Sequence, residues 1–301
     1  MPGLKRSVGR GSVGSSQPRG ALSTRGLPGA ASSSLCQPDA TKSCAACCGL
    51  YNWHDHSREA LNSLLARRTS LFLSLGDPPA LDAYRRLSQS LPSSAKERED
   101  VYNCEFLGFL DEERGRVGCL LHPSIKGRMD LRDRSFYGPA LCAGHLCPSN
   151  AVLTPLEQAA VAMTLDDWYL YGPVITDIGL VKGTLTEVEG RLERPLSTAD
   201  FADSGVLDGL RAIWALKETW RFASKGNGLT ACCFSLAEYR LARSELGKRW
   251  KTRPSRFQEI LLSLSSEFPG EDEVQEAESI IEEKLSALVE ACGKISPSQW
   301  P

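Results

Sequence analysis

The chain has 301 residues, enough for one large domain or two ordinary ones. Its apolar content of 42% and charged content of 24% are those of a globular protein, and no apolar run is long enough to cross a membrane as a helix. The formal net charge of -2 gives no electrostatic reason to expect binding to nucleic acid or to an anionic membrane, so neither partner is predicted.

Residues 1–35 are rich in Gly, Ser, Arg and Pro and carry five basic residues and no acid. Such a segment cannot bury enough apolar surface to order itself, so a disordered basic tail is predicted. The tail lacks the apolar stretch of a secretory signal, and we therefore expect a cytoplasmic protein. In a reducing cytoplasm, clustered cysteines bind metal more often than they form disulfides.

The next segment, residues 36–150, holds eight of the eleven cysteines and all four histidines. Two helices are predicted in its first half, from Ser57 to about Leu75 and from about Ala80 to Leu91. From Tyr102 to Asn150 no helical or strand period is sustained. We expect a metal to organise this part, because the free energy of metal binding becomes folding free energy.

Residues 151–301 are predicted to form an all-helical domain. Thr154 and Glu157 make a capping box with Pro155 at the first helical position, and Ser235 with Glu238 makes a second box. The expected helices cover about residues 155–171, 177–193, 199–223, 236–249, 255–267 and 271–292. The fold class is therefore mainly α, with an irregular metal-organised cysteine-rich region followed by a helical domain that offers a surface to a protein partner.

The cysteines are spaced for chelation. Cys44 and Cys47 form a C-x2-C pair, in which two thiolates on one turn reach the same ion without strain. The adjacent Cys47 and Cys48 point in different directions, so one of them packs while the other binds, or the site holds two ions or a cluster. Thiols and imidazoles are preferred ligands of zinc, iron and copper.

These residues resemble the bacterial cysteine-cluster proteins of the YkgJ type, which are described as zinc- or iron-chelating domains. The matching stretches are Thr41–Gly49 (TKSCAACCG), Cys104–Leu107 (CEFL), Gly118–Pro123 (GCLLHP) and Leu141–Pro148 (LCAGHLCP). The resemblance covers about residues 36–150 and does not extend to the helical half. It departs from the family at Thr41, where the family has a cysteine. Either Cys36 substitutes through a longer loop, or the site has one ligand fewer.

The predicted metal ligands are Cys44, Cys47, Cys48, Cys104, Cys119, Cys142 and Cys147, with Cys36 and His145 as additional candidates. His122 serves equally well as a turn residue or as a ligand. His54 and His56 stand just before a predicted helix and are assigned to its cap and to the surface. Cys292 and the pair Cys232-Cys233 are assigned to packing.

No catalytic signature is recognisable, so catalytic residues are unknown and enzymatic activity stays open. We expect a metal-binding protein with an iron–sulfur cluster or zinc and a mainly structural or accessory role. The alternative is an iron–sulfur-dependent enzyme such as a protein-modifying methyltransferase, which the resemblance allows. A disulfide or redox-switch protein would need an oxidising compartment. Spacing does not separate zinc from an iron–sulfur cluster, although the thiols outnumber the four ligands of one tetrahedral zinc.

Overall fold

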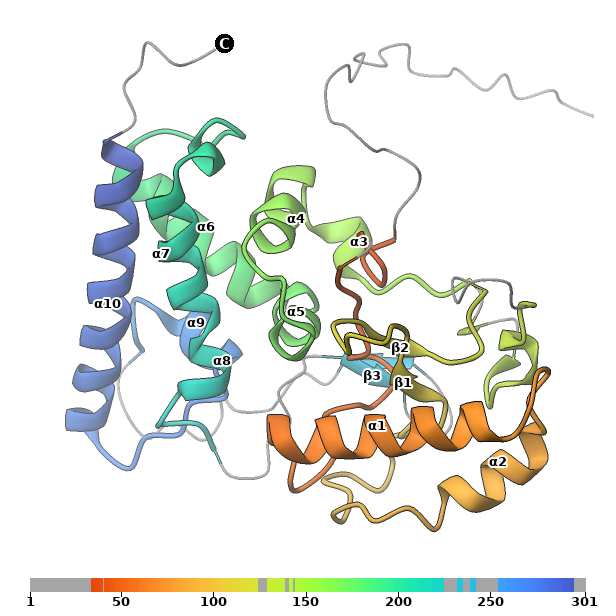
Figure 1. Cartoon of the computed structure of the whole chain (residues 1–301). Helices are drawn as coiled ribbons and strands as arrows, with labels where there is room; N and C mark the ends of the chain where they lie inside the picture. Colours follow the sequence, from red (N-terminus) through yellow and green to blue (C-terminus); the bar gives the residue numbers. More distant parts are fainter. Residues whose placement is uncertain are drawn as a thin grey trace, which may run out of the picture. The chain divides into compact units, whose positions relative to one another are not determined.

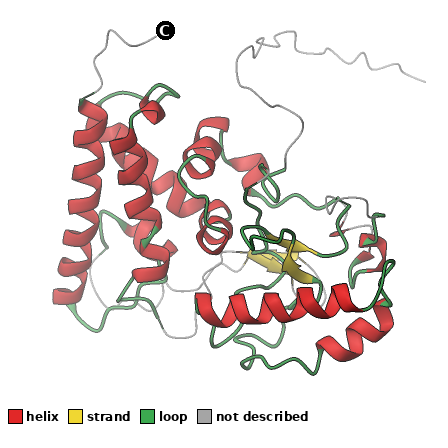
Figure 2. Cartoon of the chain, viewed as in Figure 1, coloured by secondary structure: helices red, strands yellow, loops and turns green. Residues whose placement is uncertain are grey.

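The computed structural model describes residues 34–39, 41–123, 129–138, 141–142, 144–224, 232–234, 239–241 and 254–294. All of them belong to one compact unit that begins at residue 33. Helices dominate this part of the chain and the strands are short (Figures 1 and 2), which confirms the mainly α prediction. The predicted tail lies outside the described residues except at Ser34 and Leu35, and Leu35 is buried.

Helix α1 (Arg58–Ser74) is the longest helix of the cysteine-rich segment (Figure 1). Its N-cap is Ser57, whose hydroxyl accepts a hydrogen bond from the Ala60 N–H; neither His54 nor His56 caps the helix, contrary to the prediction. Four apolar residues of α1, Leu61, Leu64, Leu65 and Phe72, are buried. The helix packs against a short hairpin that begins with β1 (Leu107–Phe109). Helix α2 (Leu81–Ser88) follows, as the sequence predicts.

The hairpin pairs β1 with β2 (Val117–Cys119) in antiparallel register, with Leu107 opposite Cys119. It lies in the segment that showed no sequence period, because three-residue strands are too short to display an alternation. The Phe109 N–H donates to the Thr69 hydroxyl at 2.7 Å and thereby fixes the hairpin to α1.

The remaining described elements are mostly helical (Figure 1). They are η1 (Arg132–Arg134), α3 (Ser149–Val152), α4 (Pro155–Ala162), α5 (Trp168–Ile175), α6 (Ile178–Leu192), η3 (Asp200–Ala202), α7 (Ser204–Trp214), α8 (Leu216–Thr219), β3 (Cys232–Phe234), β4 (Tyr239–Leu241), α9 (Gln258–Ser263) and α10 (Glu271–Gly293). Helix α10 packs along α7 and α6, and α9 packs on α6. The capping box at Thr154 is present, with both of its hydrogen bonds.

Several predicted helices are divided. The helix expected over 155–171 becomes α4 and α5, because the Thr164 hydroxyl bonds back to the Ala160 carbonyl and Asp167 caps a new helix. The helix expected over 199–223 is likewise interrupted where Asp203 caps α7.

The predicted helix over 236–249 is wrong at Tyr239–Leu241, which pairs as strand β4 with β3. Ladder hydrogen bonds to a second segment replace the helical ones there, and a local periodicity cannot signal such a partner. The rest of that range, together with Ser235 and its expected capping box, lies outside the described residues.

One apolar core extends through both the cysteine-rich segment and the helices. Every residue of α5 is buried, and two of its tyrosines form hydrogen bonds to residues 35–51. The Tyr51 hydroxyl donates to the Tyr169 carbonyl at 2.9 Å, and the Tyr171 hydroxyl donates to the Leu35 carbonyl at 3.0 Å. The predicted boundary near residue 150 stays a prediction, but apolar and polar contacts cross it.

None of the described helices is both long and apolar enough to cross a membrane.

A buried ion pair joins three of the later helices. The Lys217 ammonium lies 2.6 Å from an Asp177 carboxylate oxygen, and the two side chains are only 5% and 7% exposed. The ammonium also donates to the Ser263 carbonyl, and the Ser263 hydroxyl donates to the second Asp177 oxygen. The pair therefore connects α8, the start of α6 and the end of α9.

We expect Lys217→Met to lower the free energy of unfolding by about 3–5 kcal/mol, since it leaves the buried Asp177 charge without its cation. Lys294→Met is the matched control, because Lys294 and its partner Glu290 are 70% and 74% exposed, and its effect should stay within about 0.5 kcal/mol. Urea unfolding of both variants measures the difference. Equal effects would contradict a structural role for the buried pair.

Candidate metal centre

The centre begins at the turn that carries Cys44, Cys47 and Cys48. The Cys44 N–H donates to the Cys36 carbonyl at 2.8 Å, which places Cys36 beside this turn. Ala45 and Ala46 are buried, while the three cysteines of the turn are partly buried. The small alanines let the turn lie directly on the core.

A second segment docks on this turn by a backbone hydrogen bond. The Cys104 N–H donates to the Cys48 carbonyl at 3.0 Å, and Cys104 is buried. Gly49 makes the approach possible: its φ is +76°, and a Cβ there would lie 2.2 Å from the Tyr102 carbonyl oxygen. Only glycine tolerates both the left-handed backbone and this contact.

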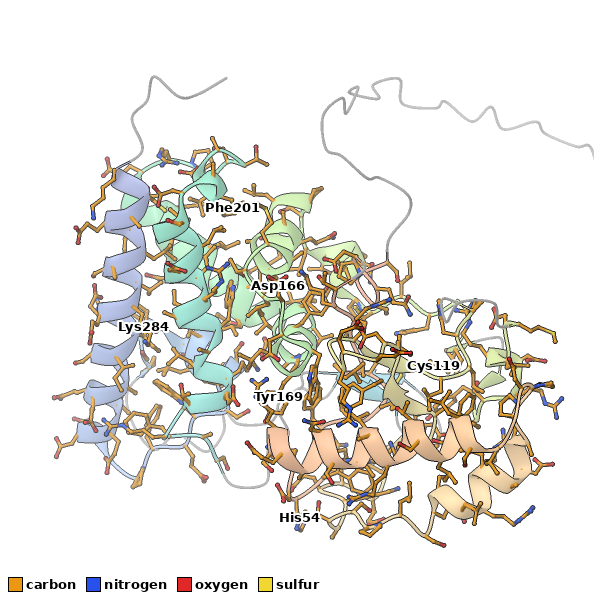
Figure 3. All side chains as sticks on the ribbon, in the orientation of Figure 1. His54, Cys119, Asp166, Tyr169, Phe201 and Lys284 are labelled. Atoms are coloured by element: carbon orange, nitrogen blue, oxygen red, sulfur yellow. The ribbon has the colours of Figure 1, made fainter. Side chains whose placement is uncertain are left out.

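Strand β2 supplies the third segment and ends at Cys119, which pairs with Leu107 in the hairpin (Figure 3). The Leu120 N–H donates to the Phe106 carbonyl at 2.8 Å, so Cys119 is fixed next to the chain that follows Cys104. Cys119 is partly buried.

Electrostatics show which thiols lie near one another. Burial raises the pKa of Cys48 well above its ordinary value, and the neighbouring thiols of Cys104, Cys119, Cys36 and Cys142 raise it further. Cys142 also raises the pKa of Cys119. We call Cys36, Cys48, Cys104, Cys119 and Cys142 the inner thiol cluster.

A second set of thiols surrounds Tyr171 on α5. Burial raises the pKa of Tyr171, and Cys44, Cys36 and Cys147 add to the effect. The Asn150 amide lies 3.4 Å from the sulfur of the buried Cys147. We call Cys44 and Cys147 the α5-side thiols; Cys36 is near enough to act both on Cys48 and on Tyr171.

The remaining candidates have less defined places. Cys47 is partly buried on the first turn. The backbone N–H of His145 donates to the Leu141 carbonyl. Burial lowers the pKa of the His145 imidazole, which favours the neutral form that binds metals. Burial also lowers the pKa of His122. Cys292 lies at the end of α10, and the side chains of the pair Cys232-Cys233 lie outside the described residues.

The donor set suits a borderline-soft cation in its chemistry. It is rich in sulfur and largely buried, and the neutral thiols become ligands when a cation displaces their protons. In the part of the chain that the structure describes, no three Cys, His, Asp or Glu side chains are already spaced to hold one ion. The fold therefore brings several thiols within electrostatic range of Cys48, and coordination of one ion would require their side chains to move.

Two arginines lie close to the thiols, although the sequence did not predict it. Arg132 pairs with Asp130 at 2.7 Å, as the alternating charges of this loop predict, and its charge also acts on Cys119 and Cys142. Arg68 on α1 donates to the Cys104 carbonyl at 2.9 Å. Arg68 comes from a helix distant in the chain, which no local pattern signals, whereas Arg132 lies in the loop between Cys119 and Cys142.

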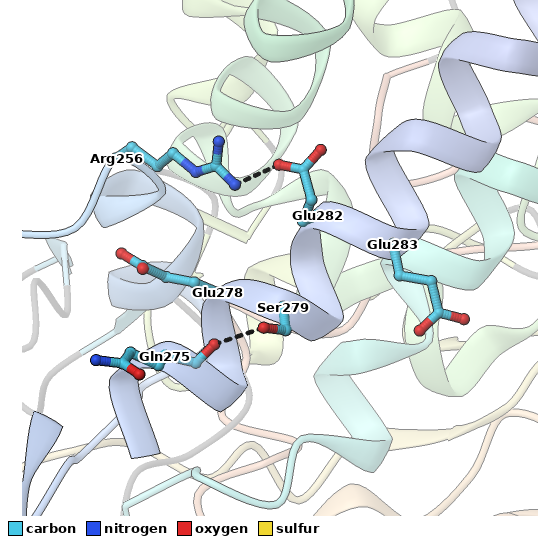
Figure 4. A pocket seen from close by; sticks show the side chains of 6 residues that line it. All are labelled: Arg256, Gln275, Glu278, Ser279, Glu282 and Glu283. Atoms are coloured by element: carbon cyan, nitrogen blue, oxygen red, sulfur yellow. Dashed lines mark hydrogen bonds and ion pairs between the residues drawn. The ribbon is translucent and has the colours of Figure 1, made fainter. Parts of the chain in front are cut away.

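Two hollows in the surface lie apart from the thiols. One, of about 430 Å³, lies over α10 and is lined by Arg256, Glu282 and four neighbours (Figure 4). The other, of about 270 Å³, lies beside α1 and includes Trp53 and Arg67. No cysteine lines either of them, so neither contributes to the candidate centre.

Gly49→Ala should lower the free energy of unfolding by at least about 2 kcal/mol, because it combines an unfavourable φ with a collision against the Tyr102 carbonyl. The matched control is Gly190→Ala in α6, where a Cβ meets nothing within 4 Å and should stabilise the helix by about 0.5–1 kcal/mol. Urea unfolding compares the two. A neutral Gly49→Ala would show that the turn and the Tyr102 segment do not dock so closely.

Titration of Cys119 predicts a loss of stability in alkali. Burial raises the pKa of its thiol from 9.0 to about 11. Between these values the folded protein retains a proton that the unfolded chain has lost, so the free energy of unfolding falls as pH rises. The contribution is fully present below about pH 9, and about 2 to 3 kcal/mol is lost by about pH 11.

Urea unfolding of metal-free protein at about pH 8 and pH 11 measures this loss. The Cys119→Ala variant is the control, since other buried acids also titrate in this range. Between about pH 8 and pH 11, the free energy of unfolding of this variant should fall by about 2 to 3 kcal/mol less than that of the wild type. An identical decline in both chains would contradict the assignment.

No family model, curated protein or solved structure matches the chain. The resemblance of residues 36–150 to YkgJ-type proteins therefore stays a prediction from the spacing of the cysteines. The case for a metal centre depends on the thiols themselves and on the groups around them.

Proposed function

We propose that this chain is a metal-binding protein of the cysteine-cluster kind, with an iron–sulfur cluster or zinc in a mainly structural or accessory role. One observation carries the proposal: four thiols, from Cys36 to Cys142 along the chain, lie near enough to Cys48 to raise its pKa. Free cysteines also pack as small apolar residues, so it is the number of thiols near Cys48, more than their burial, that supports the proposal.

The residues that would hold the metal are those of the inner thiol cluster. Cys48, Cys104, Cys119 and Cys142 provide four sulfurs, and Cys36 with the α5-side thiols provides a second group. The number of sulfurs favours an iron–sulfur cluster or two ions over a single tetrahedral zinc. A bound cluster would supply one-electron chemistry, whereas zinc would supply cross-links only.

The surrounding structure supports a structural role. The segments that carry the thiols are joined by turns and by one short hairpin, and the apolar core extends from them into α5. Linking the thiols would therefore stabilise the contact between the cysteine-rich segment and the helices. We propose a cytoplasmic location, where thiols stay reduced. The helical half is the proposed surface for a protein partner. The enzyme alternative has no observation in its favour among the described residues.

The test is anaerobic purification of the full-length chain, followed by its absorption spectrum and analysis for iron, sulfide and zinc. We expect Cys104→Ala to lower metal affinity at least about tenfold. Cys292→Ala is the matched control, because Cys292 is also buried but lies at the end of α10, and it should retain the wild-type metal content. A wild-type protein without iron or zinc, or equal metal content in both variants, would contradict the proposal.

A further inference from the structure

The surface hollow of about 270 Å³ beside α1 is bounded by two parts of the chain. One wall is residues 60–67 of α1, and the other is residues 92–94. The Asp55 N–H donates to the Ser94 hydroxyl at 3.0 Å, which ties the second wall to the chain just before the helix. The fold therefore holds the two walls together. No cysteine lines the hollow, so what it binds is independent of the candidate metal centre.

The deeper lining of the hollow is apolar. Leu61 and Leu64 of α1 are buried, and Trp53 is 8% exposed. All three belong to the apolar core, so this part of the lining is well supported. The indole N–H of Trp53 is buried and has no hydrogen-bond partner among the described residues. A buried donor without an acceptor is costly, and a ligand oxygen in the hollow is the kind of acceptor that it lacks.

The rim of the hollow carries further hydrogen-bond donors. Among the described residues, Arg67 forms one hydrogen bond, to the Pro92 carbonyl at 3.1 Å, and no ion pair. Ser63 and Ser93 are exposed, and their hydroxyls form no hydrogen bond to another described residue. A guanidinium with N–H groups to spare, next to hydroxyl donors, is suited to bind an anion.

The Asp55 carboxylate limits the charge of that anion. It also lines the hollow, and it accepts hydrogen bonds from the Ser57 N–H and hydroxyl at 3.1 and 2.6 Å. These bonds lower the pKa of Asp55, so its negative charge is present at neutral pH. A carboxylate beside the guanidinium disfavours a doubly charged anion such as phosphate. The volume is just below the usual range for drug-sized ligands, which indicates a ligand of about ten non-hydrogen atoms.

We propose that this hollow binds a small carboxylate that carries an apolar group. The carboxylate binds Arg67 and the serine hydroxyls, and the apolar group packs on Leu64 and the Trp53 ring. A free aryl or alkyl carboxylic acid and the last residue of a peptide chain share this chemistry. The site is additional to the proposed function and does not depend on it.

Ligand-observed NMR with phenylpropionate and the full-length protein at neutral pH tests the site. We expect saturable binding with a dissociation constant of about 1 mM, since a small ligand in an open hollow gains little free energy. The neutral amide of the same acid has the same shape and should bind at least about tenfold more weakly, because it lacks the charge. Inorganic phosphate should not displace the acid. No saturable binding, equal binding of acid and amide, or displacement by phosphate would overturn the inference.

Two pairs of variants locate the binding. Arg67→Met should weaken phenylpropionate binding about tenfold, whereas Arg86→Met removes an exposed arginine of α2 outside the hollow and should leave it unchanged. Ser63→Phe fills the hollow from an exposed position of α1 and should abolish binding. Ser70→Phe places the same side chain at an exposed position of α1 outside the hollow and should not. Binding that survives both Arg67→Met and Ser63→Phe would overturn the inference.

An acetylated tetrapeptide with leucine at its free C-terminus identifies the source of the carboxylate. If it binds more tightly than phenylpropionate by about tenfold or more, the site takes the C-terminus of a partner chain; otherwise it takes a free acid. Metal content is measured in the same variants and should equal that of the wild type. A chain that binds phenylpropionate but no metal refutes only the proposed function, and a chain that binds metal but no carboxylate refutes only this site.

Discussion

The hydrogen bond from the Cys104 N–H to the Cys48 carbonyl is the contact on which the candidate centre depends. It joins the first cysteine turn to a segment more than fifty residues later, and Gly49 permits the approach. Because Cys104 leads directly into the hairpin, the same contact determines where Cys119 lies. Three thiols from separate parts of the chain are thereby placed together by backbone geometry before any metal is considered.

Burial has two consequences for these thiols. It keeps them neutral, since it raises the pKa of Cys48, Cys104 and Cys119, so the metal-free interior carries little negative charge. It also places them near two arginines: Arg68 donates to the Cys104 carbonyl, and Arg132 is near enough to Cys119 for their charges to interact. Carboxylates accompany both cations, since Arg132 pairs with Asp130 at 2.7 Å and Glu105 is near enough to act on Arg68.

Helix α5 connects this region to the rest of the fold. All eight of its residues are buried, and the hydroxyls of Tyr51 and Tyr171 form hydrogen bonds between the helix and the first segment. Arg58 adds a charged link, with its guanidinium on the Asp167 carboxylate at 2.6 and 2.7 Å and over the Tyr169 ring. A change at the thiols is thus expected to reach the helices through packed contacts rather than through a flexible linker.

The sequence by itself determined the density of thiols in residues 36–150, the mainly α class, and the starts of helices with strong local signals, such as Ser57 before α1 and the capping box at Thr154. These features are local, since caps and apolar periods involve residues a few positions apart. Only the tertiary structure decided that 239–241 is a strand, that Cys36 comes near both Cys48 and Tyr171, and that Arg68 is buried beside Cys104. Each of these depends on a partner segment distant in the chain, which no local pattern encodes.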